Sequence, residues 1–174
     1  MTRLATFESA VMPHLDAAYN LARWITRNDH DAEDVVQEAF MRAFRYLDRM
    51  KGVEGRPWLL TIVRNTCYSW LEKNRPAELV ALDDADAVID AMPSNAPSPE
   101  VVVLQSAQRK LVNQALEDLP VAFREVIVLR EIEDMSYKDI AAVAGIPIGT
   151  VMSRLARGRE MLKRAIEARN RKVS

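Results

Sequence analysis

The sequence is poor in the residue types that cross-link or ligate metals in small proteins. Cys67 is the only cysteine among 174 residues, which excludes an intramolecular disulfide. The two histidines, His14 and His30, are too few for a Cys/His zinc site. Only five glycines are present, and β-branched runs are few. These shortages favour a helical protein held together by packing.

Long apolar runs are scarce as well. No stretch approaches the roughly 18 apolar residues that a membrane span needs, and the N-terminus lacks the basic and apolar segments of a signal peptide. We therefore expect a cytoplasmic chain without membrane contact of its own. No nucleophile elbow, Gly-rich phosphate loop or metal-ligand spacing occurs, so we expect neither an enzyme nor a bound cofactor or metal.

Charge is spread unevenly along a chain whose net charge is only −1. Residues 77–105 contain six Asp/Glu and no Lys/Arg, together with three of the eight prolines. This composition is typical of an extended linker. The segment from Arg154 to Lys172 is basic, which favours a polyanionic partner for the end of the chain.

Helical periodicity occurs on both sides of this acidic segment. Near the N-terminus, the helix expected at 31–45 carries Val35, Ala39 and Phe44 inward, and another helix is expected from Pro57 to about Asn74. The predicted fold class is all-α. Two small helical domains, residues 1–76 and 104–174, are joined by a flexible acidic linker over 77–103, and the second domain ends in a helix-turn-helix.

The helix-turn-helix is expected over residues 135–159. Ser136 is the expected N-cap of its first helix, Gly145 the left-handed residue that ends it, and Pro147 the start of the second. Val151 and Leu155 should face inward, whereas Thr150, Ser153, Arg154 and Arg157 should face outward. A helix that begins with small and hydroxyl residues and then becomes basic suits the major groove of DNA. An ordinary helical hairpin with a solvated basic face is the alternative.

Two further helices carry side chains that could bind nucleic acid or a protein partner. In the helix over 57–75, aromatic residues alternate with Arg64 and Asn65, a combination that can stack on unpaired bases while cations hold the backbone; burial of Trp58 and Trp70 in the core is the alternative. The helix over 31–45 has an acidic outer surface that could dock a partner, or could simply be solvated.

Three motifs carry a family resemblance. They are residues 31–40 (DAEDVVQEAF), 56–65 (RPWLLTIVRN) and 145–155 (GIPIGTVMSRL). In this order, with an acidic linker between the second and third, they resemble the extracytoplasmic-function sigma factors, the smallest bacterial sigma factors of RNA polymerase. The resemblance covers roughly residues 8–76 and 104–168.

The resemblance implies three sets of contact residues. Those expected to bind the core polymerase are Asp31, Asp34, Gln37, Glu38 and Arg42. Those expected at the melted −10 element, where the loop 48–56 and the next helix would capture a flipped base, are Arg56, Trp58, Arg64, Asn65, Tyr68 and Arg75. Those expected to read the −35 duplex are Ile148, Gly149, Thr150, Ser153, Arg154 and Arg157.

The same resemblance implies the partners. They are core RNA polymerase, promoter DNA in duplex and melted form, and an anti-sigma factor that wedges between the two domains in a stress response. Because the segment after Arg169 is short, we expect no appended C-terminal regulatory domain. A stand-alone two-domain helix-turn-helix regulator is the alternative function, and the aromatic and cationic helix over 57–75 argues against it because a sensor domain has no use for that surface.

Overall fold

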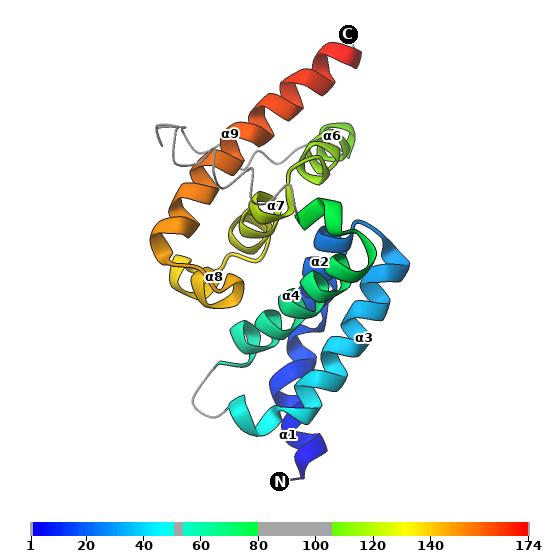
Figure 1. The fold of residues 1–174 in the computed structure, drawn as a ribbon, viewed down its shortest axis with the longest axis vertical. Helices are drawn as coiled ribbons and strands as arrows, with labels where there is room; N and C mark the ends of the chain where they lie inside the picture. The colour runs from blue at the N-terminus through cyan, green and yellow to red at the C-terminus, as the bar shows by residue number, and fades with distance from the viewer. Residues whose placement is uncertain (1, 51–53, 80–105, 174) are drawn as a thin grey trace.

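The computed structural model describes residues 2–50, 54–79 and 106–173. Within these ranges the chain forms helices and no strand (Figure 1), so the all-α fold class is confirmed. Most of the expected linker, residues 80–103, lies outside the described residues, as does the segment 51–53 of the loop expected at the −10 element.

Three long helices form the core of the N-terminal block. Its elements are α1 (Arg3–Val11), η1 (Met12–His14), α2 (Leu15–Thr26), α3 (Asp29–Arg45), η2 (Leu47–Met50) and α4 (Gly55–Asn74). Helices α2, α3 and α4 pack against one another, and they bury Leu21, Val35, Leu59 and Val63. Each such aliphatic side chain contributes about 1.5–3 kcal/mol when it leaves water.

Local signals begin and end these helices. Arg27 adopts the left-handed conformation at φ 59° and ends α2. Asn28 then begins α3, because its side chain accepts a hydrogen bond from the backbone N–H of Asp31 at 3.0 Å. At the start of α4, a Cβ on Gly55 would lie 2.4 Å from the carbonyl oxygen of Ala10. Only glycine therefore lets α4 approach α1 this closely.

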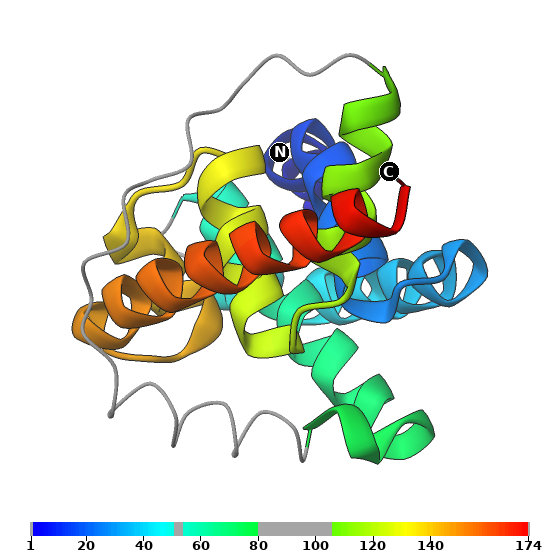
Figure 2. The same ribbon diagram turned by 90° about the horizontal axis from the view of Figure 1, so that it is seen from above.

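The C-terminal block is arranged around α7. Its elements are α6 (Ser106–Glu117), α7 (Val121–Ile127), the π-helical η3 (Val128–Ile132), α8 (Tyr137–Ala144) and α9 (Ile148–Val173). Helix α9 packs on α6, α7 and α8, and it crosses over the block in Figure 2. Gly158 permits close packing of α9 on α7, since a Cβ there would lie 2.9 Å from Cδ1 of Ile127.

The two blocks dock against each other, an arrangement that the sequence left open. Helix α7 contacts both α9 and α2 and lies between them, and α8 packs on α4 (Figure 1). Buried side chains of both blocks belong to one continuous apolar cluster. We call the surface between the blocks, where α7 and α8 meet α2 and α4, the seam.

Candidate nucleic-acid and polymerase interfaces

The helix-turn-helix forms as its local signals predict. The Ser136 hydroxyl accepts a hydrogen bond from the backbone N–H of Asp139 at 3.1 Å and begins α8. Gly145 ends α8 in the left-handed region at φ 68°, and the axes of α8 and α9 differ by 98°. The start of α9 therefore projects away from α8, with Ile148 and Met152 about half exposed (46% and 52%).

The residues expected at the −35 element have unequal access to a ligand. Ile148 and Gly149 are exposed, and Thr150, Ser153 and Arg157 are half-buried. Arg154 is only 7% exposed, so the expectation that it faces outward is wrong. In α9 the inward face contains Val151, Leu155, Gly158 and Leu162. Arg154 follows Val151 by three residues and adjoins Leu155, which places it at the edge of that face.

The residues expected at the −10 element differ in exposure and in the bonds that they form. Asn65 is exposed, as an approaching single strand requires, and Trp58 is half-buried against the core. The remaining four residues, Arg56, Arg64, Tyr68 and Arg75, are half-buried and all form bonds within the molecule. Burial of Trp58 and Trp70 agrees in part with the core alternative, because both pack against buried residues.

Glu125 of α7 binds two of these residues across the seam. Its side chain is fully buried (0% exposed). It accepts hydrogen bonds from Arg64 Nε at 3.0 Å, Arg64 Nη2 at 3.2 Å and the Tyr68 hydroxyl at 2.8 Å. The Arg64 guanidinium also lies 3.6 Å from the centre of the Tyr68 ring. A carboxylate buried this deeply is stabilised because three donors satisfy it.

Burial and charge act together on the groups around Glu125. Burial lowers the pKa of Arg64, but the Glu125 carboxylate and the Tyr68 hydroxyl together outweigh this effect and the pKa is raised. Burial, followed by the charge of Glu125, raises the pKa of the Tyr68 hydroxyl well above its usual range. The same two causes raise the pKa of the buried Cys67 thiol. Tyr68 is therefore held as a neutral donor and Arg64 as a cation.

Arg124, the neighbour of Glu125, also crosses the seam. It is 2% exposed and donates to the backbone carbonyls of Trp24 at 2.6 Å and Ile25 at 3.1 Å, near the end of α2, and to that of Leu119 at 2.5 Å. Burial, with a smaller effect of Arg27, lowers the pKa of Arg124 to about 10, so it stays charged at neutral pH. It satisfies carbonyls that the end of a helix leaves without partners.

Arg124 and Glu125 were not among the residues that the sequence motifs predicted to have a function. They interrupt an apolar run that contains Phe123 on one side and Val126 on the other. Their position could have indicated a role, since two adjacent charged residues between core residues need partners from another element. The identity of those partners depends on how the blocks dock.

Two more of the residues expected at the −10 element have partners within the molecule. Arg56 donates to the backbone carbonyl of Glu133 at 2.5 Å across the seam. Arg75 donates to the carbonyl of Thr26 within its own block, and its guanidinium lies 4.7 Å from the centre of the Trp70 ring. The cationic groups of this surface are therefore engaged in the free chain.

The residues expected to bind the polymerase lie along α3. Asp34, Gln37 and Glu38 are exposed, and their spacing puts them on one side of the helix. Glu38 pairs with Arg42 at 2.8 Å, and Asp31 is half-buried in the first turn. The surface is acidic and open in the described part of the chain.

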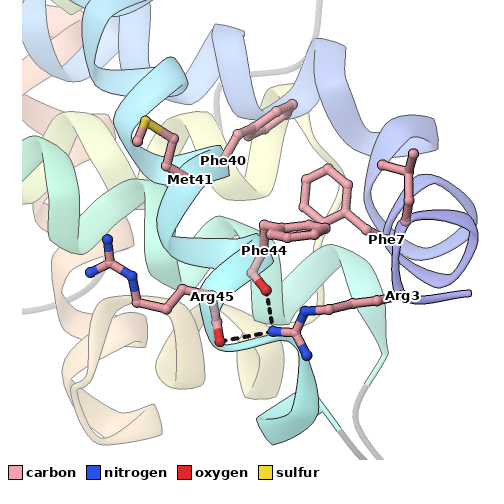
Figure 3. A pocket seen from close by; sticks show the side chains of 7 residues that line it. Arg3, Phe7, Phe40, Met41, Phe44 and Arg45 are labelled. Carbon is pink, nitrogen blue, oxygen red and sulfur yellow. Dashed lines mark hydrogen bonds between the residues drawn. The ribbon is translucent and has the colours of Figure 1, made fainter.

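An apolar groove lies beside this surface, between α1 and the end of α3 (Figure 3). It is lined by Arg3, Leu4, Phe7, Phe40, Met41, Phe44 and Arg45. Phe44 is 38% exposed rather than inward as expected, because it lines this open groove. Its ring contacts the Phe7 ring edge-on, with 5.4 Å between the ring centres, and the Arg3 guanidinium lies 5.2 Å from its centre. Arg3 donates to the carbonyls of Phe44 and Arg45 and so completes the end of α3.

The described residues offer little for a metal site or a membrane span. Among the described residues no group of three or more His, Cys, Asp or Glu is placed to hold a metal ion. No single described helix has the length and apolar character to cross a membrane; only the bent pair Tyr137–Ala144 and Ile148–Lys172 passes that test jointly.

Comparison with known proteins identifies both blocks. Residues 10–76 match the family model of sigma-70 region 2, and residues 109–162 match that of sigma-70 region 4. Among solved structures, the sigma factor RpoE of Bartonella quintana, in complex with the anti-sigma factor NepR, superposes with a TM-score of 0.69 at 29% identity, covering 92% of this chain and 96% of that one. CnrH, in complex with the cytosolic domain of CnrY, gives 0.65 at 28%, covering 93% and 88%.

Curated relatives give the same result. The ECF RNA polymerase sigma factor SigE of Mycolicibacterium smegmatis is 34% identical over 160 residues, which cover 92% of this chain and 61% of that relative. The ECF RNA polymerase sigma-E factor of Haemophilus influenzae is 34% identical over 152 residues, covering 84% and 79%. Together with the order of the two regions along the chain, this similarity shows that the chain belongs to the extracytoplasmic-function family of RNA polymerase sigma factors.

Proposed function

We propose that this chain binds core RNA polymerase in the cytoplasm and directs initiation at promoters that carry a −10 and a −35 element. In this proposal the acidic side of α3 binds the polymerase, α4 contacts the melted −10 strand, and the start of α9 reads the −35 duplex. The chain itself has no catalytic step, because the polymerase makes the phosphodiester bond. One observation carries the proposal: a region 2 block precedes a region 4 block whose α8 and α9 form a helix-turn-helix.

Physical considerations favour this division of labour. A net charge of −1 gives little of the sequence-independent attraction to phosphates on which most DNA affinity rests. Each DNA contact alone should be weak, and a polymerase that holds both at a set distance raises the effective concentration of the second. Strand melting costs stacking energy, which single-strand contacts on α4 would offset.

Within α9, we assign direct reading of the duplex to the accessible residues. Ile148, Gly149, Thr150, Ser153 and Arg157 have surface to offer, whereas Arg154 would act mainly by supporting α9 from its buried edge. The Ser153 hydroxyl donates to the Gly149 carbonyl at 3.0 Å, and it would have to exchange that bond for a base contact.

An anti-sigma factor is a further proposed partner. The sigma factor RpoE, which superposes on this chain, was solved in complex with one. The stand-alone regulator is not favoured, because residues 10–76 match sigma-70 region 2, a module that such a regulator has no need to carry.

A run-off transcription assay with purified core polymerase tests the function. We expect transcripts from a subset of promoters only when the chain is added, and co-elution of the chain with the core. Asn65→Ala should lower open-complex formation and Arg157→Ala should lower −35 duplex binding, while Ser69→Ala, an exposed position on α4 outside the assigned set, should do neither. A chain that neither binds the core nor directs initiation would refute the proposal.

A further inference from the structure

The contacts of Glu125 have the chemistry of an anion site. Arg64 offers two N–H groups and Tyr68 one O–H to the same carboxylate, all within 3.2 Å. Both donors come from α4, four residues apart and therefore on one side of the helix. The anion comes from α7, an element of the other block.

A nucleic-acid phosphate would satisfy the same donors. The planar guanidinium fork matches carboxylate and phosphate geometry alike, and a phenol hydroxyl donates to either. The Tyr68 ring under the Arg64 guanidinium, at 3.6 Å, keeps that fork in place. Since single-strand binding surfaces combine cations with aromatic rings, the site on α4 has the composition expected of a backbone contact.

Only one of the two anions can occupy the site at a time. Glu125 is fully buried and covers the donor groups of Arg64 and Tyr68, and the Arg64 side chain is only 16% exposed, so a DNA strand can replace the carboxylate only after α7 has moved away. Arg124, next to Glu125, holds α7 on the end of α2, and Arg56 is bonded to the carbonyl of Glu133. The seam therefore covers several residues of the proposed −10 surface together.

Simultaneous engagement of both promoter elements requires the blocks to separate. Elements centred near −10 and −35 lie about 25 base pairs apart, or roughly 85 Å at ~3.4 Å per base pair. In the docked arrangement α8 packs on α4, so the two readers cannot span that distance. Leu79 and Ser106 are 27 residues apart in the sequence, enough chain to reach about 90 Å at ~3.3 Å per residue.

We propose that Glu125 occupies a nucleic-acid phosphate site on α4, formed by Arg64 and Tyr68, and thereby keeps the free chain from binding single-stranded DNA until the blocks separate. This inference rests on the function proposed above. It assigns Arg64 and Tyr68 to the phosphate backbone of the −10 strand. Docking of the seam and strand binding then compete, so that seam opening and strand binding reinforce each other.

The test measures single-strand binding by the full chain without polymerase. The probe is a fluorescent mixed-sequence 12-nucleotide DNA, because phosphate contacts are independent of sequence. Glu125→Ala removes the internal anion. If the open form is the minor one, its population limits the apparent affinity, and we expect Glu125→Ala to bind about tenfold more tightly. Glu131→Gln is the matched control, since Glu131 pairs with Arg159 within the C-terminal block at 2.6 Å, and its affinity should equal that of the wild type.

Small-angle scattering of the wild type supplies a second measurement, which does not depend on the folding of a variant. Saturating DNA should increase the radius of gyration of the wild type, and Glu125→Ala should start from a larger radius without DNA. An unchanged wild-type radius with bound DNA, or equal DNA affinity in a folded Glu125→Ala, would overturn the proposal. Inorganic phosphate is tested in parallel: if it alone expands the chain as DNA does, the site takes free phosphate and the assignment to a DNA strand is wrong.

Failure of the inference is distinguishable from failure of the proposed function. Run-off transcription with excess core polymerase should proceed with wild type, Glu125→Ala and Glu131→Gln alike. Normal transcripts combined with unchanged single-strand affinity would refute only the role of Glu125, whereas absence of transcripts from all three would refute the sigma-factor activity.

Discussion

Side chains that hold the two blocks together at the seam also cover residues that are proposed to bind DNA. Arg64 and Tyr68 share one carboxylate, that of Glu125, and both would lose a buried partner if Glu125 were replaced. A buried ion pair of this kind contributes little net stability compared with apolar packing, yet removal of one partner is costly. The pair therefore specifies one docked arrangement without making it very stable.

Tyr68→Phe should show how much the Tyr68 hydroxyl contributes to the free energy of unfolding. Loss of a hydrogen bond to a charged group should lower the free energy of unfolding by about 1.5–3 kcal/mol at pH 8. Because the folded-state pKa of Tyr68 is raised, the neutral phenol stabilises the fold fully below the unfolded pKa of about 10. That stability is lost as the pH rises above 10, so the difference between wild type and Tyr68→Phe should shrink there.

Urea denaturation at several pH values between 8 and 10.5 measures this effect. Tyr137→Phe is the control, because the Tyr137 side chain is half-buried against Arg130 and its hydroxyl makes no hydrogen bond among the described residues. A constant difference between wild type and Tyr68→Phe across this range would contradict the burial of a neutral Tyr68.

Among the helices, α9 has two roles that different parts of it perform. Its first turns project from α8 as the proposed reader of the −35 duplex, and its middle packs on α7 through Gly158. Helix α7 in turn packs on α2. The orientation of the reading helix and the docking of the blocks are therefore connected through α7.

Gly158→Ala should weaken the packing of α9 on α7. The new Cβ would lie 2.9 Å from Cδ1 of Ile127, so we expect a loss of about 1–2 kcal/mol in the free energy of unfolding. Ile127→Val removes that methyl group and should itself cost about 0.5–1.5 kcal/mol. The double variant should be more stable than the sum of the two losses predicts, as a thermodynamic cycle from urea denaturation would show. Strict additivity would mean that the two residues do not meet.

The molecule as a whole has charges of opposite sign on the two sides of its seam. Arg23 of the N-terminal block pairs with the Glu117 carboxylate of the C-terminal block, and Arg64 pairs with that of Glu125. Arg56 donates in the same direction, to the neutral backbone carbonyl of Glu133. Arg124 is an exception, because this arginine belongs to the C-terminal block and donates to a carbonyl of the N-terminal block. Because these contacts are buried or half-buried, they should resist screening by salt better than exposed pairs.

Arg124→Ala should uncouple the two blocks. The carbonyls of Trp24 and Ile25 would lose a buried donor, and α7 would lose its hold on α2. We expect calorimetry to show one unfolding transition for the wild type and two for Arg124→Ala. Arg169→Ala breaks a pair within the C-terminal block, with Asp118 at 2.6 Å, and should shift the transition without splitting it. A single transition in Arg124→Ala would mean that the remaining contacts of the seam couple the blocks without Arg124.

Local interactions were readable from the chain alone. The cap at Ser136, the left-handed turn at Gly145, the helical class and the sigma-factor motifs all depend on residues a few positions apart. Such signals survive without knowledge of the fold, because the hydrogen bonds that cap and turn helices form between near neighbours.

The tertiary structure decided which polar groups remain available to a partner. Arg154 and Arg157 look alike in the sequence, yet one lies at the buried edge of α9 and the other at its surface. Arg64 and Tyr68 were recognised as candidates for binding DNA, but their engagement by Glu125, 61 and 57 residues away, depends on the docking of α7 on α2 and α4. Burial and long-range pairing are properties of packed surfaces, and no pattern within one helix contains them.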